Sequence, residues 1–283
     1  MQRRQFLSAA MAAPALASLA HGQSRFRAEL GINIYSVRSM ASKDLPGTLK
    51  LLKELGFRMV EAGDLYGRSA KEFQALLKSN GLRATSFGAS YKALDTQIET
   101  VAADAKTIGA SYVVCSTIPH SAKHLTASDV TSAAQKLNAW GKVLTKHGLK
   151  LCYHTHGTEF DPSPDGTQFD SLLKQTDPKH VNYEMDIFWI VYGLQDPVDF
   201  LKRYPNRFPL MHVKDMRHGM VLNQTPAQVA EDDSVPLGTG VVKIPPALEA
   251  GQKYGVKHFY LEEEAVDALP QIKQSLKFIE GLR

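Results

Sequence analysis

The amino-acid sequence predicts a closed (β/α)8 barrel, and two observations support this fold class. From Glu29 onward, eight short apolar runs alternate with helix-periodic segments without a break in composition. Glycine residues, which tolerate the left-handed conformation that ends a helix, follow five of the predicted helices, at Gly56, Gly81, Gly109, Gly148 and Gly255. An open doubly wound sheet is the alternative. No Gly-x-Gly-x-x-Gly follows the first strand, which counts against it.

The predicted strands are short apolar runs bounded by turn residues. In chain order they are Leu30–Tyr35, Arg58–Ala62, Arg83–Phe87, Tyr112–Ser116, Lys150–His154, Val181–Asp186, Pro209–Val213 and His258–Glu262. In the first predicted helix, leucine recurs every three or four residues while lysine and glutamate occupy the other side. The predicted helices are Leu45–Leu55, Ala70–Ser79, Leu94–Ile108, Ala127–Lys146, Asp170–Gln175, Pro197–Arg203, Pro245–Tyr254 and Leu269–Leu282.

One connection is too long for a simple turn. Residues 216–243 separate the seventh strand from its helix, and Val221, Leu222, Val229 and Val235 offer apolar anchors within them. Long connections at the catalytic face of a barrel are usually lids or binding loops. We therefore expect an ordered lid or binding loop rather than a disordered one.

The first twenty residues differ from the rest. Arg3-Arg4, followed by an Ala-rich run without charges up to Ala20, resembles a twin-arginine export signal. An amphipathic helix is the alternative, but this run has no polar face. We expect residues 1–20 to direct the protein to the periplasm and residues 21–283 to form a single barrel domain.

Composition excludes several classes of function. The chain has 283 residues, 43% of them hydrophobic and 22% charged, with a net charge of +4. Lys and Arg are scattered rather than gathered in a stripe, which argues against a nucleic-acid partner. No apolar stretch after residue 20 is long enough to span a membrane. Cys115 and Cys152 lie inside predicted strands, where we expect buried free thiols rather than a disulfide.

Polar side chains stand at the ends of four predicted strands in the second half of the chain. They are His154 or His156, Asp186, His212 and Glu262. Because barrel enzymes place their active sites at the carboxyl ends of the strands, these side chains are expected to converge. Imidazole and carboxylate together suit a divalent cation, with Mn²⁺ in first place and Zn²⁺, Co²⁺ or Fe²⁺ as alternatives.

Each candidate ligand also has a structural interpretation. A histidine in a strand is often a hydrogen-bonded core residue, and Asp186 would be satisfied by an ion pair with an arginine. Glu262, Glu263 and Glu264 would form a solvated turn. The proximity of Lys214 and Asp215 to His212 favours the ligand interpretation.

These residues resemble the xylose isomerase-like TIM barrels, a broad group of sugar isomerases and epimerases that also includes inosose dehydratases and endonuclease IV-type enzymes. The resemblance covers nearly all of residues 29–283. Its most specific parts are Tyr153-His154-Thr155-His156, Asp186, Met211-His212-Val213-Lys214-Asp215, Leu261-Glu262 and Gly56-Phe57-Arg58-Met59-Val60-Glu61. An endonuclease IV-type role is not expected, because no histidine follows Asp186 closely and no basic groove is present.

The resemblance implies one divalent metal held by a Glu, an Asp, a His and a second Glu. The last three correspond to Asp186, His212 and Glu262, whereas His154 stands where the first Glu is typical. In epimerases of the group the two ligand glutamates also serve as paired acid and base. With His154 in place, one of this pair is missing, and Glu159 is the expected replacement.

The expected roles are therefore as follows. Catalysis is assigned to Glu262, Glu159, His156 and Lys214. Substrate contacts are assigned to Tyr35, Glu61, Trp189 and Asp215, with the aromatic rings stacking on a sugar.

The predicted function is a metal-dependent sugar isomerase or epimerase. Its first step would remove a proton from the carbon next to a metal-bound carbonyl of a small carbohydrate, giving an enediolate. The alternatives are a lyase or dehydratase that eliminates from a 3-keto-glycoside or inosose, and a barrel that binds sugar without catalysis. Relatives suggest a homodimer, with no nucleic-acid or membrane partner after signal removal.

Overall fold

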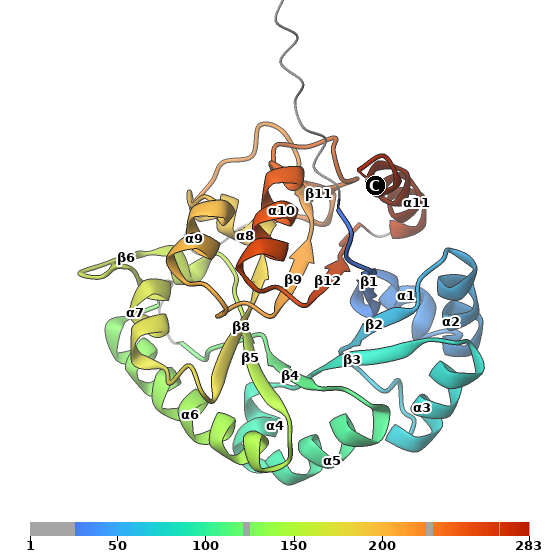
Figure 1. The fold of residues 1–283 in the computed structure, drawn as a ribbon, viewed down its shortest axis with the longest axis horizontal. Coiled ribbons are helices and arrows are strands. Elements are labelled where there is room, and N and C mark those ends of the chain that lie inside the picture. The colour runs from blue at the N-terminus through green and yellow to red at the C-terminus, as the bar shows by residue number, and fades with distance from the viewer. Residues whose placement is uncertain (1–25, 121–124, 225–228, 266, 283) are drawn as a thin grey trace, which may run out of the picture.

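The computed structural model describes residues 26–120, 125–224, 229–265 and 267–282. Eight parallel strands form a closed barrel in the order β1-β12-β9-β8-β5-β4-β3-β2 (Figure 1). They are β1 (Leu30–Asn33), β2 (Met59–Ala62), β3 (Arg83–Gly88), β4 (Tyr112–Cys115), β5 (Lys150–His154), β8 (Val181–Asp186), β9 (Leu210–Val213) and β12 (His258–Leu261). The predicted fold class is confirmed, and every predicted strand is present with its ends shifted by at most two residues. The twin-arginine-like segment lies outside the described residues.

Helices surround the barrel as an outer layer (Figure 1). They are α1 (Arg38–Ala41), α2 (Leu45–Glu54), α3 (Ala70–Ser79), α4 (Tyr91–Thr96), α5 (Ile98–Ile108), α6 (Ala127–Lys146), α7 (Gln168–Gln175), α8 (Ile187–Tyr192), α9 (Pro197–Arg203), α10 (Ile244–Tyr254) and α11 (Ala268–Glu280). The five glycines expected to end helices all have positive φ, between 65° and 107°. None of the helices in the described part of the chain combines the length and apolarity needed to cross a bilayer.

Two helical predictions need correction. The single helix expected over Leu94–Ile108 is two helices, α4 and α5, because Gln97 adopts φ −143° and ψ 31° between them. A short helix, α8, was not expected after the sixth barrel strand. It begins directly at Asp186, whose carboxylate accepts hydrogen bonds from the backbone N–H groups of Phe188 and Trp189 and so caps the helix.

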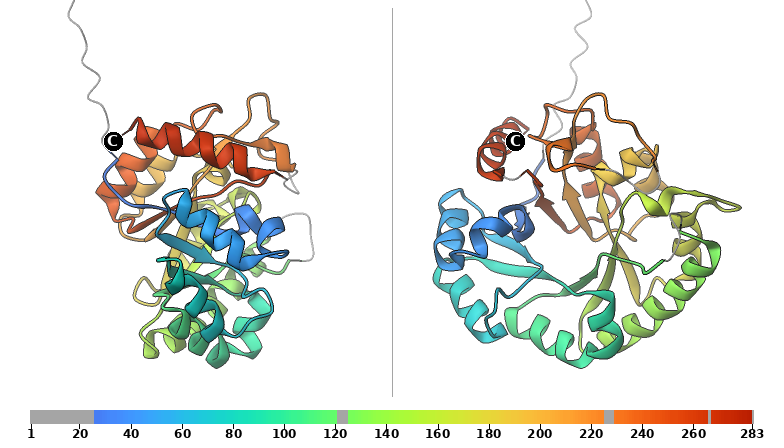
Figure 2. Two further views of the ribbon diagram at one scale, coloured as in Figure 1. Left: turned by 90° about the vertical axis from the view of Figure 1, so that its right-hand side faces the viewer. Right: turned by 180° about the vertical axis from the view of Figure 1, so that it is seen from behind.

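The two ends of the described chain meet beside the barrel. The backbone N–H of Phe26 donates to the carbonyl of Leu282, 3.1 Å away. Figure 2 shows α11 lying along the side of the barrel where β1 begins, in contact with the 3₁₀ helix η1 (Ile34–Val37). This helix closes the barrel on the outside where β1 pairs with β12.

Apolar packing occurs in two places. The larger cluster fills the layer between the strands and the helices. A smaller one fills the lower part of the barrel interior and consists of Met59, Tyr112, Val114, Cys152, Leu210 and Tyr260. Cys152 belongs to the inner cluster and Cys115 to the outer one. Both are buried free thiols, as predicted, because they lie on opposite faces of the sheet.

The long connection after β9 is ordered where it is described. It contains the two-stranded sheet of β10 (Asp215–Met216) and β11 (Ser234–Val235) and the 3₁₀ helix η3 (Glu231–Asp233). A second small sheet, β6 (Pro162–Ser163) with β7 (Gly166–Thr167), and the 3₁₀ helix η2 (Thr158–Phe160) follow β5.

Candidate metal centre and active site

The alternation of side chains along each strand places the polar residues inside the barrel. Successive residues of a strand point to opposite faces, so residues two apart share a face. Leu210 lies in the inner apolar cluster, and two residues later His212 faces the same interior. The same step leads from Met59 to Glu61 and from Tyr260 to Glu262. The barrel interior is thus apolar toward the amino ends of the strands and lined by ionisable side chains at their carboxyl ends.

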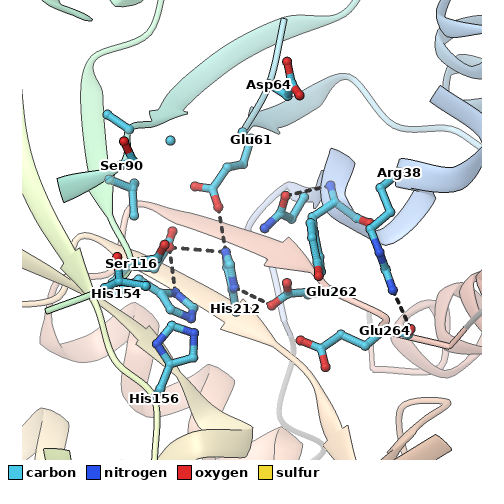
Figure 3. A pocket seen from close by; sticks show the side chains of 18 of the residues that line it. Arg38, Glu61, Asp64, Ser90, Ser116, His154, His156, His212, Glu262 and Glu264 are labelled. Atoms are coloured by element: carbon cyan, nitrogen blue, oxygen red, sulfur yellow. Dashed lines mark hydrogen bonds and ion pairs between the residues drawn. The ribbon is translucent and has the colours of Figure 1, made fainter. Parts of the chain in front are cut away.

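His212 is the centre of this ionisable layer. Its Nδ1 lies 2.7 Å from Oε2 of Glu262, and its Nε2 lies 2.8 Å from Oε1 of Glu61. The same Nε2 is 3.3 Å from Oε2 of Glu184. Three strands other than its own therefore direct carboxylates at one imidazole (Figure 3).

His154 forms the second half of the centre. Its Nδ1 lies 2.9 Å from Oε2 of Glu184, which leaves its Nε2 4.0 Å from Oδ2 of Asp186. The imidazoles of His154 and His212 have centroids 4.6 Å apart. All four side chains are buried.

The buried charges shift the pKa values in opposite directions. Burial alone would lower the pKa of His212, but the charges of Glu184, Glu262 and Glu61 hold it well above its usual value. Burial, together with the charge of His212, holds the pKa of His154 well below its usual value. His154 is therefore neutral at neutral pH, as a metal ligand must be, while His212 carries a proton.

The carboxyl groups are affected by the same burial. Burial and the neighbouring charge of Glu61 raise the pKa of Glu184 well above its usual value, and burial raises that of Asp186 to about 7. For Glu262 the charges of His212 and Lys214 outweigh burial and hold the pKa below its usual range. Together with Glu61, four carboxyl groups are buried at one site. Their ionisation there costs free energy unless positive charge lies between them.

A divalent cation fits this arrangement. Oε1 of Glu184 and Oδ2 of Asp186 are buried and have no hydrogen-bond partner among the described residues. Two overlapping groups of ligand atoms lie within 4.8 Å of one another: His154, Glu184 and His212 form one, and Asp186, His212 and Glu262 the other. Imidazole nitrogen with carboxylate oxygen suits Mn²⁺, Zn²⁺, Co²⁺ or Fe²⁺. The four residues predicted as ligands are therefore brought together.

A cavity of about 880 Å³ opens above these residues. Among the residues expected to act on substrate, Tyr35, Glu61, His156, Trp189 and Glu262 line it. The ring of His156 packs against that of Trp189, with centroids 5.5 Å apart, and burial lowers the pKa of His156. No hydrogen bond to either ring nitrogen of His156 is found among the described residues.

Lys214 does not line the cavity, contrary to expectation. Its buried ammonium lies 2.7 Å from Oε1 of Glu264 and 4.8 Å from the centroid of the Phe188 ring. Burial alone would lower its pKa, but Glu262, Asp186 and Glu264 hold it above the usual value. It is thus a fixed positive charge beside the centre, not a group that exchanges protons with substrate.

Glu159 and Asp215 are also not at the cavity. Glu159 accepts hydrogen bonds from the Tyr153 hydroxyl and the His156 backbone N–H and so fixes the turn after β5. Asp215 accepts hydrogen bonds from the backbone N–H groups of Met216, Gly238, Gly240 and Val242 and so holds the long connection. Both carboxylates are fully occupied inside the protein, which is why neither is free to meet a substrate.

Glu184 was missed by sequence reasoning. It lies two residues before Asp186 on β8, and the alternation of side chains places both in the interior. The sequence does contain an indication of its role, because a glutamate inside an apolar strand lies two residues before a candidate ligand and therefore on the same face.

Several known proteins are similar to this chain. An inosose dehydratase of Geobacillus kaustophilus (strain HTA426) is 27% identical over 214 residues, or 65% of this chain and 68% of that protein. Inosose dehydratases of Clostridium botulinum and Bacillus cereus match over 61% of their own length. A sugar phosphate isomerase/epimerase of Parabacteroides distasonis superimposes with a TM-score of 0.72 at 23% identity, covering 93% of this chain and 96% of that one.

An IOLI protein with a bound zinc atom superimposes with a TM-score of 0.70 at 15% identity, covering 90% of this chain and 97% of that chain. Both structural likenesses concern the fold. The model of the family described as xylose isomerase-like TIM barrel matches residues 49–282, and the chain therefore belongs to this family.

Proposed function

We propose that the protein is a divalent-metal-dependent carbohydrate lyase or dehydratase. It would remove a proton from the carbon next to the carbonyl of a keto-sugar or keto-polyol and expel the oxygen substituent on the following carbon. The observation that carries the metal-dependent part is the group of ligand atoms of Asp186, His212 and Glu262, all within 4.8 Å of one another, with an unpartnered oxygen of Asp186 facing His154. Similarity to inosose dehydratases supports elimination as the outcome.

The cation would be held by His154, Asp186, His212 and Glu262. When bound, it would supply Lewis-acid stabilisation of the negative charge that develops on a substrate oxygen as the neighbouring carbon loses its proton. The remaining chemistry belongs to side chains that line the cavity.

His156 is the proposed base. Its ring lines the cavity, has no hydrogen-bond partner among the described residues and is neutral because burial lowers its pKa. A neutral imidazole accepts the proton from carbon through one ring nitrogen. The same nitrogen then returns this proton to the departing oxygen, which leaves as water or as an alcohol, and the electron pair of the broken C–H bond forms the double bond. One residue suffices for both transfers, which suits a site where Glu159 is occupied elsewhere.

An isomerase or epimerase is the second candidate. His156 and Glu61 lie on opposite sides of the His212 ring in the cavity (Figure 3). Ionisable groups on two sides of a substrate are what proton removal from one face and return to the other require. This arrangement supports the second candidate. Against it counts that Glu159, expected as the second acid or base, is held by hydrogen bonds and does not line the cavity.

Proton NMR in D₂O separates the candidates. The Mn²⁺-loaded protein is incubated with a 3-keto-glycoside and with an inosose. Elimination yields an enone with a vinyl proton and a freed alcohol or water, whereas isomerisation or epimerisation yields an intact ring with deuterium beside the carbonyl. We expect the enone, at a rate reduced about 10²- to 10⁴-fold in His156→Asn with metal content unchanged. Deuterium exchange without elimination would replace the lyase by the isomerase.

We also propose export to the periplasm, on the strength of Arg3-Arg4 and the apolar run after them. Cell fractionation of the wild-type chain and of an Arg3→Lys, Arg4→Lys variant tests this. Retention of the variant in the cytoplasm is expected; equal export of both would contradict a twin-arginine route.

A further inference from the structure

The cavity extends well beyond the metal centre. Besides the ionisable residues, it is lined by residues that follow β1, β2, β3 and β4. Those that carry the argument here are Tyr35, Asp64, Tyr66 and Ser90. Figure 3 shows Asp64 and Ser90 at the end of the cavity away from His156 and His212. We call Tyr35, Asp64, Tyr66 and Ser90 the outer subsite.

Tyr66 stands in a turn that does not favour tyrosine. Its φ is 52°, the following Gly67 has φ 71°, and the N–H of Arg68 donates to the carbonyl of Leu65, 3.1 Å away. Positive φ at both central residues is the pattern of turns that select Asn, Asp or Gly. A tyrosine there costs roughly 1–2 kcal/mol. The ring that this turn carries lines the cavity and also packs against the apolar layer between the strands and the helices.

Asp64 holds the backbone of this turn. Its Oδ1 accepts a hydrogen bond from the N–H of Tyr66 at 2.7 Å. Its other oxygen has no partner among the described residues. Asp64 therefore fixes the position of Tyr66 and keeps one acceptor for a ligand hydroxyl.

Tyr35 is the second aromatic wall. It is 48% exposed, and the guanidinium carbon of Arg38 lies 4.3 Å from its ring centroid. The terminal nitrogens of Arg38 donate to the Tyr35 carbonyl, to Oε1 of Glu231 and to the Glu264 carbonyl. Arg38 thus braces the ring from one side and leaves the remainder of it accessible.

The charge of the outer subsite does not favour an anionic ligand, because Asp64 is its one carboxyl group and it contains no cationic side chain. Five carboxyl-bearing residues line the whole cavity, namely Glu61, Asp64, Glu184, Glu262 and Glu264. Histidines aside, Arg38 is the one cationic side chain that lines the described cavity, and its terminal nitrogens are already engaged. A phosphate at the outer subsite would be repelled by Asp64 and would find no free guanidinium or ammonium among the described residues that line the cavity. Hydroxyl groups, in contrast, are good donors to carboxylates.

We infer that the outer subsite binds an uncharged second ring, that of a glycosyl unit or a similar polyhydroxy ring, attached to the ring that reacts at the metal centre. This rests on the proposed function, whose substrate class it narrows to neutral glycosides. Pockets of about 300–1,000 Å³ hold drug-sized ligands, and a cavity near the upper end has room for two linked rings. Tyr35 and Tyr66 offer flat faces for the C–H side of a sugar, while Asp64 and Ser90 offer partners for its hydroxyls.

The test is equilibrium binding, measured by saturation-transfer NMR and calorimetry on the full Mn²⁺-loaded protein. The probes are cellobiose, lactose, sucrose and trehalose, with glucose, galactose, fructose and glucose 6-phosphate. We expect at least one disaccharide to bind ten times or more as tightly as either of its own monosaccharides, and glucose 6-phosphate to bind more weakly than glucose. Disaccharides no tighter than monosaccharides, or a preference for the phosphate, would overturn the inference.

Tyr66→Gly is the decisive variant, because glycine relieves the positive φ and removes the ring. Because the ring also packs against the apolar layer, thermal unfolding of the variant is recorded beside that of the wild type to confirm that it folds. The variant should lose the tenfold gain for the disaccharide while keeping the affinity for the monosaccharide. Leu194→Gly is the matched control. Leu194 also has positive φ, 58°, but is 63% exposed and does not line the cavity, so its replacement should leave all affinities unchanged.

The two proposals can fail separately. Binding of disaccharides needs no turnover, so a Tyr66-dependent gain in a protein that consumes no keto-sugar would remove the proposed function alone. Elimination from keto-sugars at a rate that Tyr66→Gly does not change, with no gain for disaccharides, would remove the outer subsite alone.

Discussion

Nδ1 of His154 lies 2.9 Å from Oε2 of Glu184, and this contact leaves the opposite ring nitrogen facing Asp186. Carboxylates that bond the far nitrogen of a ligand histidine fix its tautomer and orientation and increase its basicity. Glu184 thus places a carboxyl group behind His154, whereas a ligand glutamate would contact the metal directly. The family typically has a glutamate where this chain has His154. Here the carboxyl group comes from Glu184 on the neighbouring strand β8.

Replacement of Glu184 should therefore weaken metal binding without abolishing it. Loss of such an outer carboxylate typically reduces metal affinity about 10- to 100-fold. We expect Glu184→Gln to show this loss in competition titrations with a chelating dye, whereas His212→Ala and Asp186→Ala lose the metal altogether. Glu249→Gln, an exposed position on α10, is the control. Wild-type affinity in Glu184→Gln would remove the positioning role.

Metal binding should release a proton. The carboxylates around His212 hold its pKa well above the usual value, so in the metal-free protein its imidazolium occupies the negative site. A metal ligand must be unprotonated, and the cation therefore displaces this proton. Apparent affinity should rise about tenfold per pH unit below the pKa of His212.

Calorimetric titration of Mn²⁺ in two buffers with different ionisation enthalpies measures the protons released. At neutral pH at least one proton per metal is expected, because Asp186, whose pKa burial raises to about 7, adds to the proton from His212. The number should fall at high pH. Buffer-independent heats at neutral pH would show that His212 is already neutral in the metal-free protein.

The sequence was sufficient for the fold and for much of the centre, because both depend on local periodicity. Each barrel strand is an apolar run, and His154, Asp186, His212 and Glu262 stand where such runs end. Three predicted site residues do not line the cavity, for a different reason. Glu159, Lys214 and Asp215 are close to the centre in sequence, but hydrogen bonds and ion pairs within the protein occupy them. Glu264, which pairs with Lys214, and residues 238–242, which donate to Asp215, lie more than twenty residues away, where the local sequence does not report them. The partners of Glu159 are the nearby Tyr153 and His156.

We predict that Asp215 stabilises the fold and does not contact substrate. It is buried and accepts four backbone N–H groups, three of them from residues 238–242. Unsatisfied buried donors cost about 1–3 kcal/mol each, so Asp215→Ala should lower the free energy of unfolding by roughly 3 kcal/mol or more. Urea denaturation measures this loss, and Asp232→Asn, exposed in the same connection, should change little. Normal stability with impaired substrate binding would restore the role in substrate contact.

The contribution of Glu263 to the free energy of unfolding should be larger at acidic than at alkaline pH. Its side chain is buried, and its oxygens accept hydrogen bonds from the Ser234 and Ser275 hydroxyls. Burial raises its pKa from 4.5 to about 7, so the folded state favours the protonated form. The stabilising contribution is fully present below pH 4.5 and is lost as pH rises through 7, where the unfolded chain ionises freely but the folded one resists. A pKa difference of this size corresponds to about 3 kcal/mol.

Glu263→Gln carries no ionisable group at this position and should not lose this contribution. Compared with the wild type, the variant should gain stability between pH 5 and pH 8.5, which thermal unfolding in EDTA measures without interference from metal binding. Glu249→Gln, exposed on α10, should follow the wild type throughout. If Glu263→Gln and the wild type show parallel pH profiles, then Glu263 is ionised in the folded protein at neutral pH. A neighbouring positive charge such as Lys214 would then be balancing it.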